Sequence, residues 1–112
     1  MDDADDLRDR YLDLTRRALP ERAAAEPGWP VRFDHCFMRI ALDHAVGGRW
    51  TDAVGRPAYK NLSPGQLREA VAVAERMLDG GPDVTRALDA QSLAWRGKRP
   101  KPAPRGRAGR PA

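Results

Sequence analysis

The chain has 112 residues, of which 41% are hydrophobic and 32% are charged, and its net charge is +4. A chain of this length forms one domain at most, with a single modest core. No apolar run reaches the ~20 residues that a membrane helix requires, and the acidic N-terminal segment is unlike a secretory signal. The one cysteine cannot form an internal disulfide. These features exclude a membrane partner and predict a cytoplasmic protein.

The positive charge is concentrated at the C-terminus. Residues 96–112 carry seven basic side chains and no acidic one, whereas residues 1–95 carry thirteen basic and sixteen acidic side chains. Seventeen of the twenty basic residues are arginine, and the composition is typical of a GC-rich genome. An arginine-rich stretch is therefore weaker evidence for function here than in an average sequence.

The first predicted helix runs from about Asp5 to Leu19. Its apolar side chains recur at the spacing of one helical face: Leu7, Tyr11, Leu14 and Ala18. We expect Pro20 to end this helix, because proline lacks the N–H donor and its ring clashes with the preceding turn. A linker follows and includes residues 27–30, which hold two prolines and a glycine.

The second predicted helix, residues 31–46, holds the rarest residues of the chain. One face collects an apolar stripe: Phe33, Cys36, Phe37, Ile40 and His44. Val31, Met38 and Leu42 lie on nearly the opposite side, and only a narrow strip between the two is polar. A helix that is apolar on two sides is usually the one around which others pack. We therefore expect this helix to be central and to end at the glycines 47–48.

Two more helices are predicted after a long irregular connection, residues 49–62. Ser63 and Gln66 form a capping box at the start of the third helix. The sequence Gly-Gly-Pro at 80–82 is expected to separate it from a fourth helix, which runs to Trp95. The predicted fold is therefore all-α, a small bundle of about four helices. We divide the chain into 1–29 (N-terminal helix and linker), 30–96 (helical core) and 97–112 (disordered Arg/Pro/Gly-rich tail).

The histidines and the cysteine of the second helix do not have the spacing of a metal site. His35 and His44 are nine positions apart, on opposite sides of the helix, and Cys36 and His44 are about 12 Å apart along its axis. No second cysteine is present. The sequence thus predicts no metal and no cofactor. We interpret Cys36 as a small buried apolar residue and His44 as a half-buried histidine bonded to a carbonyl.

The polar strip of the same helix allows two interpretations. Arg39 and Asp43 have the i, i+4 spacing of an ordinary surface ion pair. Alternatively, the strip and the long connection enclose a groove for an anion or another small ligand, formed by His35, Arg39, Asp43, Trp50 and Tyr59. A histidine would be the acid–base group of such a site. No nucleophile elbow, phosphate loop or dinucleotide motif supports an enzyme, so the catalytic residues of any reaction are not predicted.

The tail gives the first of two functional hypotheses. Its basic residues are typical of tails that contact phosphate backbones without sequence preference: Arg96, Lys98, Arg99, Lys101, Arg105, Arg107 and Arg110. The competing interpretation is a solvated tail shaped by codon usage. The first hypothesis is a non-enzymatic helical binding or accessory protein with nucleic acid or a protein as its partner. The second is the small-ligand or enzymatic site described above.

Several short motifs also occur together: Phe33 to Ile40, Trp50, Pro57 to Leu62, and Ser92 to Lys98. In this combination the chain resembles a group of small uncharacterised proteins that share the pattern FDHCFxRI, W, PAYxNL and SLxWRGK. The resemblance covers about residues 30–98. It implies that this span is the folded unit and that the tail is optional, and it implies no mechanism.

Overall fold

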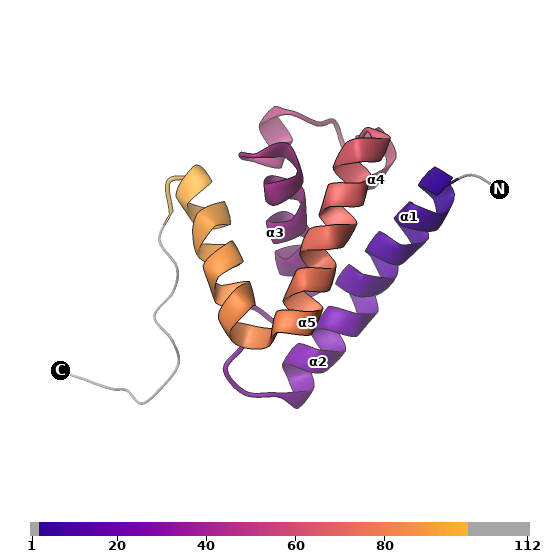
Figure 1. Cartoon of the computed structure of the whole chain (residues 1–112). Coiled ribbons are helices and arrows are strands. Elements are labelled where there is room, and N and C mark those ends of the chain that lie inside the picture. Colours follow the sequence, from indigo (N-terminus) through magenta and orange to yellow (C-terminus); the bar gives the residue numbers. More distant parts are fainter. Residues whose placement is uncertain (1–2, 99–112) are drawn as a thin grey trace.

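The computed structural model describes residues 3–98, and every regular element in this range is a helix (Figure 1). The predicted all-α class is confirmed. None of the described helices is both long enough and apolar enough to cross a membrane. The basic residues at 99–112, which were predicted to be disordered, lie outside the described range.

The N-terminal part is one continuous helical rod of three consecutive elements: α1 (Asp3–Asp13), the π-helical turn η1 (Leu14–Ala18) and α2 (Leu19–Ala25). The prediction that Pro20 ends the helix is wrong. The N–H of Leu19 donates to the carbonyl of Leu14, five residues back. A proline ring clashes with the carbonyl four residues before it, and this wider turn just ahead of Pro20 relieves the crowding.

Helix α3 (Asp34–Val46) begins later than predicted because Phe33 is extended. It ends as expected, at Gly47, whose φ of 75° is the left-handed conformation that glycine adopts readily. The following connection, predicted to be irregular, contains two short helical elements, η2 (Trp50–Asp52) and α4 (Ala58–Asn61). This connection returns the chain to the start of the last helix.

Helix α5 (Pro64–Trp95) is bent into a V (Figure 1). Its first turn has the predicted capping box, in which Ser63 and Gln66 exchange side-chain-to-backbone hydrogen bonds. At Gly81 the backbone leaves the helical region, with φ 78° and ψ −158°. The break that the sequence predicts at 80–82 is therefore confirmed, and the helix continues on both sides of it.

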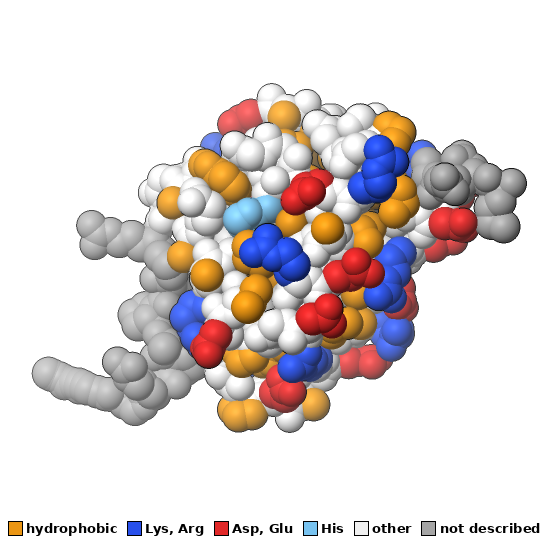
Figure 2. Space-filling view, in the orientation of Figure 1, with side chains coloured by type: hydrophobic (Ala, Val, Ile, Leu, Met, Phe, Trp, Pro, Cys, Tyr) orange, Lys and Arg blue, Asp and Glu red, His pale blue; other side chains and the backbone are white. Residues whose placement is uncertain are grey.

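Helix α3 packs against both the rod and α5, as its two apolar sides predict. Phe37 and Ile40 are fully buried, and the Trp29 ring meets Phe37 edge to face at 6.0 Å. The rod supplies the same core with further buried side chains: Tyr11, Leu14, Leu19 and Ala23. On the outer face, acidic and basic side chains lie side by side over α1 and α5 (Figure 2), and Arg10 pairs with Glu75 between these helices.

Candidate ligand-binding site

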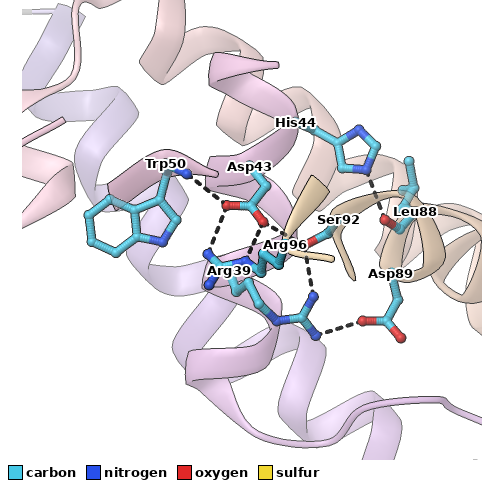
Figure 3. Close-up of polar contacts among 8 residues, drawn as sticks. All are labelled: Arg39, Asp43, His44, Trp50, Leu88, Asp89, Ser92 and Arg96. Carbon is cyan, nitrogen blue, oxygen red and sulfur yellow. Dashed lines mark hydrogen bonds and ion pairs between the residues drawn. The ribbon is translucent and has the colours of Figure 1, made fainter. Parts of the chain in front are cut away.

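The side of α3 that faces the second half of α5 carries a buried polar cluster centred on Asp43 (Figure 3). The Asp43 side chain is 0% exposed, and its carboxylate accepts four hydrogen bonds. Two come from the Arg96 guanidinium, at 2.7 and 2.9 Å, one from the Ser92 hydroxyl at 2.7 Å and one from the Trp50 backbone N–H at 3.0 Å. The predicted surface pair of Arg39 with Asp43 is wrong.

Arg39 instead pairs with a second buried carboxylate in α5. Its Nη2 donates to Asp89 at 2.6 Å, and its Nη1 donates to the Ser92 hydroxyl at 2.7 Å. We call these five residues the Asp43 network: Arg39, Asp43, Asp89, Ser92 and Arg96. Its two carboxylates and two guanidinium groups balance in charge, and the hydrogen bond from Arg96 to Asp43 raises the pKa of Arg96. The network ties α3 to the second half of α5.

His44 and Cys36, which also lie in α3, have environments that are typical of structural residues. His44 is half-buried, and its Nε2 lies 2.9 Å from the Leu88 carbonyl, which confirms the predicted interaction (Figure 3). Its ring also meets Trp95 edge-on at 4.9 Å. Cys36 is half-buried rather than fully buried. Over residues 3–98, no three His, Cys, Asp or Glu side chains gather where they could hold a metal ion.

A pocket of about 510 Å³ lies between the N-terminal rod, α3 and the 49–62 connection. It brings together three of the five predicted ligand residues, namely His35, Arg39 and Trp50. Asp43 is buried in its network and does not line the pocket, and the Tyr59 side chain lies outside the described part of the chain. The other lining residues are Tyr11, Arg16, Met38, Leu42, Arg56, Pro57 and Ala58.

The pocket has basic groups without acidic partners. Arg16 and Arg56 make no ion pair with any residue of the described range. The Arg56 guanidinium lies over the Trp50 ring, 5.6 Å from its centroid, a cation–π contact that leaves its N–H donors available. Arg39 also lines the pocket, but its charge is balanced by Asp89, so the positive character of the pocket comes from Arg16 and Arg56.

Tyr11 adds a neutral donor to the same pocket. Burial raises the pKa of Tyr11 well above its ordinary value, against the opposing effect of the nearby Arg16 charge. The phenol therefore stays protonated at any physiological pH. Its hydroxyl has no hydrogen-bond partner among the described residues, although the Tyr11 carbonyl accepts from Thr15 at 2.8 Å. Together with the apolar Met38 and Leu42, these groups suit an anion that carries an apolar part.

Of the seven basic residues predicted to contact nucleic acid, two lie within the described part of the chain. Arg96 belongs to the Asp43 network and is largely buried, whereas Lys98 is exposed. The remaining five lie outside the described residues: Arg99, Lys101, Arg105, Arg107 and Arg110.

Sequence reasoning missed Tyr11, Arg16 and Arg56. Tyr11 and Arg16 lie far from α3 in the chain, and only the packing of the rod against α3 brings them to the pocket. Arg56 lies in the 49–62 connection, whose unusual length indicates a functional segment. The length does not indicate which residue of the segment contributes to the site. Comparisons of the chain with protein-family models, with curated proteins and with solved structures find no match.

Proposed function

We propose that this chain is a helical binding protein that holds a small organic anion in the pocket between the N-terminal rod and α3. The observation that carries the proposal is the pair of arginines, Arg16 and Arg56, which line one pocket without a carboxylate partner in the described structure. A guanidinium presents a planar fork of donors that matches a carboxylate or phosphate. A ligand with such a group would supply the missing countercharge.

The other lining residues support binding and define the second half of the ligand. The Trp50 ring and the side chains of Met38 and Leu42 offer apolar contact, and small-molecule sites commonly combine such a lining with a few polar groups. Among the described lining residues His35 is the one histidine, and no serine, threonine or cysteine lines the pocket with it. These features favour binding over covalent catalysis.

The test uses 8-anilinonaphthalene-1-sulfonate, a fluorescent sulfonate with an aromatic body. We expect saturable binding to the folded chain, with an affinity that falls about fivefold or more in Arg16→Ala and in Arg56→Ala, because each loses a charged hydrogen-bond donor. Arg76→Ala is the matched control, since Arg76 is an exposed arginine of α5 outside the pocket. Circular dichroism checks that all variants are folded. Equal affinity in the three variants, or no saturable binding, would refute the proposal.

The first hypothesis from the sequence stays a prediction. Contact between the basic tail and nucleic acid depends mainly on residues beyond 98, so no observation on the described residues favours it over a protein partner. It differs from the pocket hypothesis in one respect that is simple to measure. Binding through the tail would be lost in a chain that ends at residue 98, whereas binding in the pocket would not.

A further inference from the structure

An exposed aromatic pair stands beside the pocket. Phe33 is 64% exposed, and it is the one large hydrophobic side chain of the described range that is exposed in this way. Its ring stacks on the His35 ring, with centroids 5.8 Å apart and planes within 5°. The His35 side chain is itself 77% exposed. Both rings are thus largely exposed, and the rest of the described chain leaves them accessible to a ligand.

This aromatic pair is continuous with the pocket. His35 lines the pocket, and Arg39 follows it by one helical turn, about 6 Å along the α3 axis. A ligand that contacts the Phe33–His35 pair and also reaches Arg16 and Arg56 therefore needs both a flat ring and an anionic group.

We propose that the pocket binds a nucleoside phosphate unit, with its base stacked on the Phe33–His35 pair and its phosphate held by Arg16 and Arg56. In such a unit the sugar joins the base to the phosphate. Bases stack on exposed aromatic side chains in a sequence-tolerant way, and arginine forks match phosphate oxygens. This inference rests on the proposed function and specifies the ligand of the same pocket. The unit is either a free nucleotide or part of a single strand.

The decisive comparison is between adenosine 5′-monophosphate and ribose 5-phosphate, each titrated calorimetrically into the full chain. We expect the nucleotide to bind about fivefold or more tightly, because only it carries a base that can stack. Phe33→Leu keeps an apolar side chain but removes the flat ring, so it should abolish this difference and leave the affinity for ribose 5-phosphate unchanged. Because Phe33 is exposed, the variant should keep the wild-type melting temperature.

A short oligothymidylate, measured with the same variants, identifies the source of the unit. The tail can bind such a strand by charge alone, so the informative quantity is the change caused by Phe33→Leu at constant salt. A loss of affinity for the free nucleotide alone identifies a nucleotide ligand, and a loss for the strand as well identifies single-stranded nucleic acid. If Phe33→Leu weakens neither, the inference is overturned.

The two proposals fail in different ways. If the anilinonaphthalene sulfonate still requires Arg16 and Arg56 while the nucleotide and ribose 5-phosphate bind equally, the pocket is an anion site and the nucleotide assignment is wrong. If none of the three ligands depends on these arginines, both proposals fail. Arg76→Ala again serves as the control for a general loss of positive charge.

Discussion

Two neighbouring polar regions of this molecule use arginine in opposite ways. In the Asp43 network, Arg39 and Arg96 each donate to a buried carboxylate at 2.6 to 2.9 Å. In the pocket, Arg16 and Arg56 have no carboxylate partner among the described residues. Arg39 belongs to both regions, because its guanidinium is held by α5 while its side chain forms part of the pocket wall.

The difference follows from access to water. A charge that is removed from water is tolerated only when it is paired and hydrogen-bonded, so the contact between α3 and α5 contains matched charges. The guanidinium groups of Arg16 and Arg56 lie beside an open pocket and stay hydrated. The chain can therefore fold without giving them a carboxylate partner. The matched charges therefore serve the structure, and the unmatched ones remain available to a ligand.

The largest expected loss of stability comes from breaking the Asp43 network. Asp43→Ala removes the acceptor of four hydrogen bonds and leaves Arg96 without its partner. Removing one member of a buried ion pair typically lowers the free energy of unfolding by about 3–5 kcal/mol. Urea denaturation measures this loss. Glu75→Ala, which breaks the exposed pair with Arg10, should cost less than about 1 kcal/mol. Similar losses in both variants would show that the network is solvated.

A smaller loss is expected from Gly81→Ala, which disturbs the turn that directs the second half of α5 towards α3. The φ of 78° and ψ of −158° at Gly81 are essentially restricted to glycine, and strain of this kind costs about 1–3 kcal/mol. Gly65→Ala, in the first turn of α5, is the matched control. Its added methyl group meets only an arginine side-chain end at 4.0 Å, so it should be neutral or stabilising. Thermal unfolding compares the two variants.

Substitutions of the two unpaired pocket arginines should change the stability of the fold only slightly. Arg16→Ala and Arg56→Ala are each expected to change the free energy of unfolding by less than about 0.5 kcal/mol, the usual range for surface substitutions. The same denaturation series as for Asp43→Ala measures this. If either variant loses as much stability as Asp43→Ala, that arginine belongs to the folded core and the contrast between the two regions is lost.

The smallest effect concerns a partly buried contact outside both regions. Glu26 accepts from the Trp29 indole N–H at 3.0 Å and from Arg22 at 3.1 Å, and these hydrogen bonds lower the pKa of Glu26 below its ordinary value of 4.5. A carboxyl group with a lowered pKa stabilises the fold above its unfolded pKa, and this contribution is lost as the pH falls through its folded pKa. Wild type should thus lose slightly more stability than Glu26→Gln between pH 6 and 3. If the stabilities of wild type and Glu26→Gln fall in parallel over this pH range, the lowered pKa of Glu26 is contradicted.

The sequence by itself determined the local features of this fold. The capping box at Ser63, the helix end at Gly47 and the break at Gly81 were all predicted, because each depends on the preferences of a few adjacent residues. The two apolar sides of α3 likewise predicted its central place. Pro20 is the exception, since a turn of π-helix just before it removes the clash on which the prediction depended.

Only the tertiary structure decided which charges are paired. The sequence predicted an ion pair between Arg39 and Asp43 from their spacing. Their partners are instead Asp89 in α5 and Arg96 at its C-terminal end, about fifty positions further along the chain. Arg16 and Arg56 come to one pocket from opposite sides of α3 in the sequence. Helix-forming signals act within one or two turns, whereas burial and ion pairing depend on which faces of distant segments meet. A single sequence can therefore indicate which helix carries the site. It does not indicate which residues from distant segments complete that site.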